Sequence, residues 1–302
     1  MHELSMLSRK DHDMKLDTNL VGTLLESVTS SWDKRDCALY ALGIGAGQQH
    51  AACELEFTTD GSNGRPQLVY PTFGVIHGGN AAVPPLLAAL GDAVDFSQML
   101  HGEQRLEQLE APPSQANVIS QARVSAAWDK GSATVIETVA ETRDAETDTP
   151  YFRSTQSMFF RGVGGWGGER GPSTAKWSPP AAPPTRTLTA SSRPDQALLY
   201  RLTGDTNPLH VDPDVARAAG FERPILHGLC AYGIVGRVLL NSYVGADPTR
   251  FVSLDVRFSR PTMPGDTLTI QTWQVSPTVV EFQTINPDGA AVHTGGRFTF
   301  RQ

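Results

Sequence analysis

The chain has 302 residues, of which 39% are hydrophobic and 19% are charged, a composition typical of a folded protein with one large or two ordinary domains. Its formal net charge of −7, without a basic stripe, argues against a nucleic-acid-binding protein but leaves room for a local positive patch that binds an anion. No apolar run reaches the length of a membrane span, and charges near the start argue against a signal peptide.

In chain order, residues 1–19 are polar and predict a loose tail, and a first body follows at 20–161. A run of small and apolar residues at 75–90 predicts a helix. Apolar and polar residues then alternate at 117–128 and 133–142, where Val, Thr and Ile are frequent. This pattern predicts strands with one buried face.

A Gly- and Pro-rich segment at 162–187 comes next, and its composition predicts a linker without regular hydrogen-bonded structure. The second body, at 188–302, repeats the order of the first, because an apolar helix at 229–240 precedes strand-like segments. These segments lie at 251–259, 266–275 and 278–286. A helix followed by antiparallel strands, given twice, predicts the α+β class and two diverged copies of one unit.

Three cysteines, an odd number without the spacing of metal ligands, are present at Cys37, Cys53 and Cys230. They predict reduced thiols in a reducing compartment, and hence a cytoplasmic protein.

The segment YRLTGDTNPLH, residues 200–210, contains a concentration of chemically active side chains. Asp205, Asn207 and His210 share a loop that Gly and Pro keep irregular. A carboxylate and an imidazole close together can divide the proton transfers around a water molecule, and the Asn207 amide can orient that water. Alone, the same residues are also typical of a structural turn. Asp212, which precedes a Pro, predicts a helix N-cap and not a catalytic group.

Gly228 begins the apolar helix of the second body. A glycine there exposes a backbone N–H at the positive end of the helix dipole, where it can stabilise a thioester oxygen that becomes negative during a reaction. The alternative is that Gly228 only permits close packing of the helix on the sheet. The preceding His227 is predicted to be a buried, hydrogen-bonded side chain and not a second base.

The stretch YRLTGDTNPLHVDPDVARAAGFERPILHGLCAYG resembles the MaoC-like (R)-specific enoyl-CoA hydratases of type 2. The resemblance continues in VRFSRPTMPGDTL, and in the first body in YALGIGAG, YPTFGVI, LHGEQRLE and WDKG. It covers nearly the whole chain after the first 20 or so residues. It implies a double hot-dog fold, in which two antiparallel sheets each wrap around a long central helix.

The resemblance also implies a hydro-lyase of fatty acid metabolism. Water would add reversibly to a trans-2-enoyl-CoA and give the (3R)-3-hydroxyacyl-CoA. By position, Asp205 and His210 would activate the water, Asn207 would support them, and the Gly228 N–H would bind the thioester oxygen. No metal or redox cofactor is implied, since CoA is part of the substrate. The first body has Gly43-Ile44-Gly45-Ala46-Gly47 in place of the catalytic loop, and would serve binding only.

The same resemblance places His101, Gly102, Lys130 and Phe258 along the binding surface for the CoA thioester. From the residues alone, Lys130 is a turn lysine and Phe258 is an ordinary core residue. The small residues at 43–47 would leave room for an acyl chain, or would reflect tight packing.

Two other functions fit parts of the pattern: a hot-dog acyl-CoA thioesterase, and a non-catalytic acyl-CoA-binding subunit. A homodimer is expected, because the edges of a hot-dog sheet invite pairing. A peroxisomal location would fit a eukaryotic source, although the last residues, Phe300-Arg301-Gln302, are not the Ser-Lys-Leu signal.

Overall fold

The computed structural model describes residues 18–61, 64–94, 99–172 and 177–302. Within these residues, ten strands form one antiparallel sheet in the order β1-β3-β4-β5-β2-β7-β10-β9-β8-β6. The predicted tail at 1–19 lies outside the described residues except at its end, where Thr18–Leu20 forms a single 3₁₀ turn.

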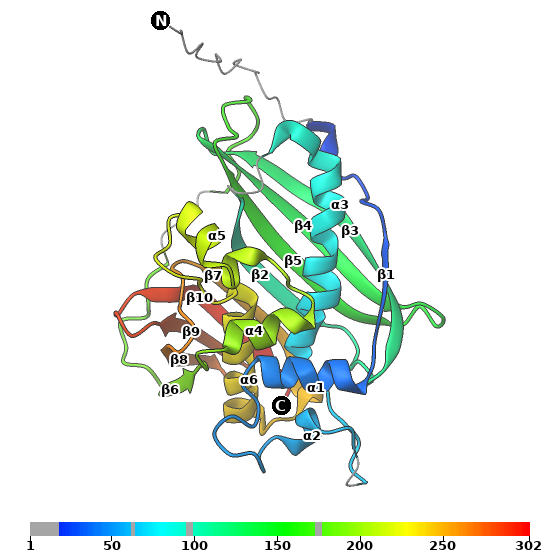
Figure 1. Ribbon diagram of the computed structural model, residues 1–302, viewed down its shortest axis with the longest axis vertical. Coiled ribbons are helices and arrows are strands. Elements are labelled where there is room, and N and C mark those ends of the chain that lie inside the picture. The colour runs from blue at the N-terminus through cyan, green and yellow to red at the C-terminus, as the bar shows by residue number, and fades with distance from the viewer. Residues whose placement is uncertain (1–17, 62–63, 95–98, 173–176) are drawn as a thin grey trace, which may run out of the picture.

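The first half of the sheet comes from the first half of the chain (Figure 1). In β3 and β4, buried side chains alternate with more exposed ones over most of the strand, as the sequence predicts. Its strands are β1 (Val28–Trp32), β2 (Met99–Gln108), β3 (Ala116–Asp129), β4 (Ala133–Asp144) and β5 (Pro150–Arg161).

The second half of the sheet repeats this arrangement in the C-terminal part of the chain. Its strands are β6 (Arg186–Ser191), β7 (Phe251–Phe258), β8 (Thr267–Ser276), β9 (Val279–Ile285) and β10 (Ala291–Phe300). The described part of the 162–187 linker contains neither helix nor strand before β6.

The two halves are joined along β2 and β7, which pair antiparallel from Glu103↔Arg257 to Glu107↔Ser253. An ion pair between Arg105 and Asp255, at 3.0 Å, crosses this seam. The prediction of two sheets is thus refined to two five-stranded sheets fused edge to edge.

The residues that the structure describes also contain six α-helices. They are α1 (Lys34–Gly43), α2 (Leu55–Thr58), α3 (Ala81–Leu90), α4 (Gln196–Tyr200), α5 (Pro213–Ala218) and α6 (Gly228–Val244). Asp212 caps α5 by accepting hydrogen bonds from the backbone N–H groups of Asp214 and Val215, which confirms its predicted structural role.

The helix predicted at 75–90 is not uniform. It begins with a 3₁₀ turn at Pro71–Phe73, widens into a π-helical turn at Ile76–Asn80 and continues as α3. By length and composition Pro71–Leu90 could cross a membrane, but 56% of its most apolar window is buried inside the protein, as expected of a core helix.

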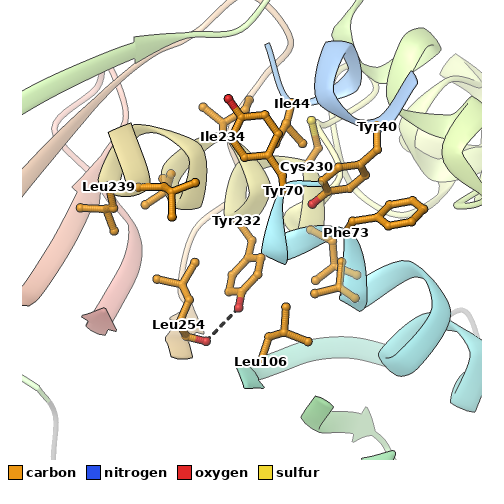
Figure 2. Packing of buried hydrophobic residues seen from close by; sticks show 14 of the residues in the cluster. Tyr40, Ile44, Tyr70, Phe73, Leu106, Cys230, Tyr232, Ile234, Leu239 and Leu254 are labelled. Carbon is orange, nitrogen blue, oxygen red and sulfur yellow. Dashed lines mark hydrogen bonds between the residues drawn. The ribbon is translucent and has the colours of Figure 1, made fainter. Parts of the chain in front are cut away.

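The larger core crosses the seam between the halves (Figure 2). Tyr40 of α1 and Ile44, which follows it, meet Tyr232 and Ile234 of α6 there. The Tyr232 hydroxyl donates to the Leu254 carbonyl of β7 at 2.8 Å. A smaller core lies under α3. Because the larger core takes side chains from both halves, each half depends on the other for burial.

Candidate active site

The loop between α4 and α5 positions the three polar residues that the sequence singles out. Gly204 has φ +128°, a conformation that side chains rarely adopt, and it turns the chain out of a 3₁₀ turn at Arg201–Thr203. Asn207 then caps the next 3₁₀ turn, Pro208–His210, because its Oδ1 accepts from the Leu209 N–H at 3.1 Å. Asn207 therefore shapes the loop, while Asp205 and His210 are brought together.

His210 is oriented for use as a base. Its ring is 9% exposed, and Nδ1 lies 3.0 Å from the Ile225 carbonyl oxygen. Since a carbonyl only accepts, Nδ1 carries the proton and the lone pair of the neutral ring is on Nε2. Burial lowers the pKa of His210, although the Ile225 hydrogen bond and the charge of Asp205 oppose the shift. The imidazole is therefore neutral at physiological pH.

His227 connects this loop to helix α6. Its ring is fully buried and lies 3.9 Å from the His210 ring, at an angle of 32°. Its Nε2–H donates to the backbone oxygen of Asp205 at 3.1 Å. Burial, and secondarily the charge of His210, lower the pKa of His227 to about 3. His227 is thus a neutral, hydrogen-bonded side chain, as predicted. Because it directly precedes Gly228, its bond ties Asp205 to the start of α6.

Asp205, His210 and His227 form a compact group. Asp205 is half-buried and its Oδ1 accepts from the Asn207 N–H at 3.3 Å. One ligand atom from each of the three side chains lies within 4.8 Å of the others, so this group could hold a metal ion by distance. Two imidazoles and a carboxylate also suit proton transfer without a metal.

Gly228 is the first residue of α6, and the N-terminus of this 17-residue helix has no side-chain cap. Its first N–H groups are therefore free to bind an acceptor, which the helix dipole favours. A Cβ on residue 228 would lie 3.3 Å from the ring of Phe258, a tight contact. Gly228 therefore also permits close packing, as the alternative interpretation predicts.

A cavity of about 770 Å³ opens beside Phe258 and is lined by all four residues of the predicted CoA surface, His101, Gly102, Lys130 and Phe258. Its wall includes Val135 of β4, which alternates with the core residue Ile136, so the cavity lies on the sheet face opposite α3. The His101 and Phe258 rings are 4.8 Å apart, and Phe258 borders both the cavity and Gly228.

His101 is a half-buried residue of the cavity lining, and its Nε2 lies 3.1 Å from the Glu103 carbonyl oxygen. Burial lowers the pKa of His101 to about 4, outweighing this hydrogen bond, which acts to raise it. The ring is therefore neutral at physiological pH. It contributes a flat, uncharged surface to the cavity lining and not a positive charge.

Among the small residues at 43–47, Gly43 and Ile44 are closely packed, and none of the five lines this cavity. Ile44 is fully buried, and a Cβ on Gly43 would lie 3.5 Å from Tyr200 Cα. The Gly43 carbonyl accepts from the Gln196 amide at 2.6 Å. The packing alternative therefore holds for Gly43 and Ile44. Ala46 and Gly47 line a separate cavity of about 490 Å³, so the expected room for an acyl chain stays a prediction.

Several contacts at the site have no signal in the sequence. Ile76, in the π-helical turn, lies 3.4 Å from where a Gly204 Cβ would be, so the first half forms a wall beside the loop. Trp128 and Arg170 also line the cavity. The WDKG turn draws attention to Trp128, but nothing local distinguishes Arg170 from other linker residues.

Comparison with known proteins places this site in a family. Residues 30–162 match the MFE-2 hydratase 2 N-terminal domain, and residues 174–296 match the MaoC like domain. A probable enoyl-CoA hydratase 2 of Dictyostelium discoideum is 38% identical over 269 residues, which are 87% of this chain and 89% of that protein.

Solved structures agree with this placement. A MaoC-like dehydratase from Phytophthora capsici superposes with a TM-score of 0.82 at 31% identity, over 95% of this chain and 98% of that one. A Mycobacterium tuberculosis protein described as a double hotdog has a TM-score of 0.57 at 13% identity, over 93% and 96% of the two chains, and supports the fold alone. The chain belongs to the MaoC-like enoyl-CoA hydratase 2 family, a family of hydro-lyases with the double hot-dog fold.

Proposed function

We propose that the protein catalyses the reversible addition of water to a trans-2-enoyl-CoA, giving the (3R)-3-hydroxyacyl-CoA. The observation that carries this proposal is the bond from His227 Nε2 to the Asp205 backbone, which brings the acid–base loop to the N-terminus of α6. Proton-transfer groups and a donor for a negative oxygen then face one substrate. Both are needed when charge moves between the β-carbon and the thioester.

In the proposed reaction, the water oxygen bonds to the β-carbon while a proton is delivered to the α-carbon. His210 Nε2 accepts a proton from the water, and the Asp205 carboxylate holds the water and takes part in the proton relay to the α-carbon. Negative charge gathers on the thioester oxygen as the enolate forms, and the Gly228 N–H stabilises it there. Asn207 keeps the loop in shape for both groups.

The CoA portion of the substrate is assigned to the cavity along His101, Gly102, Lys130 and Phe258. Phe258 borders both this cavity and Gly228, so a thioester passing the Phe258 ring would reach the helix N-terminus. The acyl chain would then extend past the catalytic loop.

Substitution of the acid–base pair tests the mechanism. Asp205→Asn and His210→Ala are each expected to lower the turnover of crotonyl-CoA at least about a hundredfold, because each removes a proton-transfer group. Asp212→Asn is the matched control, since an Asn still caps α5 and lies outside the proposed chemistry. Near-wild-type turnover in folded Asp205→Asn or His210→Ala would overturn the assignment.

The same assay separates the competing functions. Loss of the enoyl absorbance without free thiol supports the hydratase, and release of CoA thiol would indicate a thioesterase. Binding without either change would indicate a non-catalytic subunit. Chiral analysis of the product tests the stereochemistry, because an (S) product contradicts the proposed (3R) outcome.

We propose that catalysis requires no metal, although Asp205, His210 and His227 are spaced closely enough to hold one. Dialysis against EDTA is therefore expected to leave the turnover of crotonyl-CoA unchanged. Added Zn²⁺ is expected to inhibit, because it would compete with the proton for His210. Loss of activity on dialysis, restored by one particular metal, would contradict this prediction.

We also propose a homodimer in the cytoplasm or a peroxisome. The large apolar side chains Leu42, Leu198 and Leu202 are 41%, 58% and 61% exposed on neighbouring parts of α1 and the α4 region, which favours association. All three cysteines are free, which fits a reducing compartment. Light scattering coupled to gel filtration measures the oligomeric state.

A further inference from the structure

Three positively charged side chains line the cavity assigned to CoA: Lys130, Arg170 and Arg257. They are not equivalent, because each has different partners. If the proposed function is right, a phosphate of the substrate's carrier must find its positive charge among these three side chains. The partners of each side chain show which charge is free.

Lys130 is committed to the linker. Its Nζ donates to the backbone oxygens of Arg170 at 2.5 Å and Pro172 at 3.3 Å, and it lies 5.6 Å from the centre of the Trp128 ring. Two of its three donors are thus used on main-chain carbonyls. To bind a phosphate, Lys130 would have to give up bonds that fix the linker.

Arg257 is neutralised by an acid on the neighbouring strand. Its Nε and Nη2 both donate to Glu103 Oε1, at 2.9 and 2.5 Å, across the β2–β7 seam. The pair carries no net charge. Arg257 therefore supplies little attraction for an anion.

Arg170 has an exposed guanidinium that makes no hydrogen bond or ion pair with any residue in the described part of the chain. Its charge reaches Asp129 only at longer range. The Asp129 carboxylate already accepts backbone N–H groups from Gly131, Gly165 and Gly167, each at 2.8 Å. Arg170 is therefore the unpaired cation of this cavity.

The backbone on either side of Arg170 is nevertheless fixed. Gly171 has φ +64°, and a Cβ there would lie 2.2 Å from the Trp128 ring, so only glycine allows the linker to lie flat on the indole. Lys130 holds the carbonyls of Arg170 and Pro172 from the other side. A free guanidinium on a fixed backbone has the planar donor set and the small ordering cost that favour binding of a phosphate.

We propose that Arg170, in the linker, is the residue that binds a phosphate of the CoA carrier, and that Lys130 is a positioning residue that holds the linker in place for it. This inference rests on the proposed function, because it assumes that a CoA thioester occupies the cavity. It assigns recognition of the carrier to a segment between the two hot-dog halves.

Arg170→Gln tests the inference through a ratio of two substrates. The preference for crotonyl-CoA over crotonyl-pantetheine, which has no phosphate, is expected to fall about tenfold in kcat/KM, since a charge-assisted hydrogen bond is lost. Arg170→Lys should restore part of the preference. Arg35→Gln, an exposed arginine on α1 away from the cavity, is the control and should keep it. An unchanged preference in Arg170→Gln would overturn the proposal, and so would equal losses on both substrates.

The double variant Lys130→Gln/Arg170→Gln separates positioning from direct contact. If Lys130 acts through the linker, the preference in the double variant equals that of Arg170→Gln alone. If Lys130 binds the phosphate itself, the two losses multiply, and the positioning role is wrong.

Calorimetric titration of free CoA distinguishes failure of this inference from failure of the proposed function. Weaker CoA binding by Arg170→Gln, with an inactive wild-type enzyme, would support Arg170 and reject the hydratase. An active wild type with equal CoA binding in both proteins would do the reverse. Titration of 3′-dephospho-CoA then identifies the phosphate: equal binding by both proteins indicates the 3′-phosphate, and a retained difference indicates the diphosphate.

Discussion

The neighbouring imidazoles of His210 and His227 are both neutral, but they differ in which ring nitrogen is free. The main chain uses Nδ1 of His210 and Nε2 of His227, so opposite ring nitrogens are left free. The free Nε2 belongs to the ring that keeps slight solvent exposure, and the free Nδ1 of His227 is enclosed. Only His210 is therefore suited to exchange protons with substrate water.

This difference predicts the pH dependence of the reaction. Burial lowers the pKa of His210 below its ordinary value of 6.5, so the base stays unprotonated to lower pH than a free histidine. The acidic limb of kcat/KM for crotonyl-CoA is therefore expected to be centred below pH 6.5. His227, with a pKa of about 3, adds no ionisation in this range.

The measurement is a pH profile of kcat/KM from about pH 4.5 to about pH 8. An acidic limb centred above pH 6.5 would contradict the role of His210 as the base. A control for acid unfolding is the circular dichroism of the same samples.

At this scale, the sequence predicts the residues with a local pattern and misses those that depend on distant partners. Asp205, Asn207 and His210 lie within one short segment of the chain, so a single loop brings them together. The bond between His227 and Asp205 joins residues 22 positions apart, and no periodicity specifies it. Arg170 stands out only when the partners of Lys130 and Arg257 are known, and those partners are tertiary contacts.

At the scale of elements, the start of α2 is joined to α6 by a largely buried ion pair between Glu54 and Arg237. Glu54, the residue before α2, accepts from Arg237 Nη1 at 3.0 Å, from the Tyr70 hydroxyl at 2.7 Å and from the Asn241 amide at 2.7 Å. Burial acts to raise the pKa of Glu54, but Arg237 and the hydrogen bonds outweigh it and the pKa is lowered. The pair therefore stabilises the fold above the ordinary Glu pKa of 4.5, and that stabilisation is lost as the pH falls.

Glu54→Ala is expected to lower the free energy of unfolding by about 3 kcal/mol at neutral pH, because it leaves Arg237 buried without its partner. Urea denaturation followed by circular dichroism measures the loss. Asp195→Ala is the matched control, since it breaks the exposed pair with Arg193 and should cause no measurable change. Equal midpoints for Glu54→Ala and the wild type would show that this ion pair is not stabilising.

The helices show where sequence patterns fail at the scale of elements. The 75–90 segment is apolar enough to predict one helix, but its π-helical turn includes Gly78 and Gly79, whose lack of side chains brings the turn against Ser154 of β5. Helix α6 continues to Val244, four residues beyond the predicted end at 240, and stops where Gly245 adopts the left-handed conformation. The five predicted strand segments lie within two residues of the bounds of β3, β4, β7, β8 and β9, whereas β1, β2, β5, β6 and β10 are not predicted individually.

At the scale of the whole molecule, the two-unit organisation is predicted, but the fusion of the two sheets is not. Pairing of β2 with β7 joins strands about 150 residues apart. The α+β class and the repeated order of helix and strands follow from local patterns. The seam depends on which two edges meet, and an edge strand looks the same in the sequence whether it is exposed or paired.

The pairing of β2 with β7 joins the two halves of the sheet by hydrogen bonds, in addition to the covalent linker between them. A protease site inserted between the exposed residues Ser178 and Pro179 and then cut is expected to leave both fragments together on gel filtration, with crotonyl-CoA turnover retained. Separation of the fragments would show that the covalent link is required. If the fragments stay together, this enzyme could be encoded as two genes, each fragment providing the missing edge of the other.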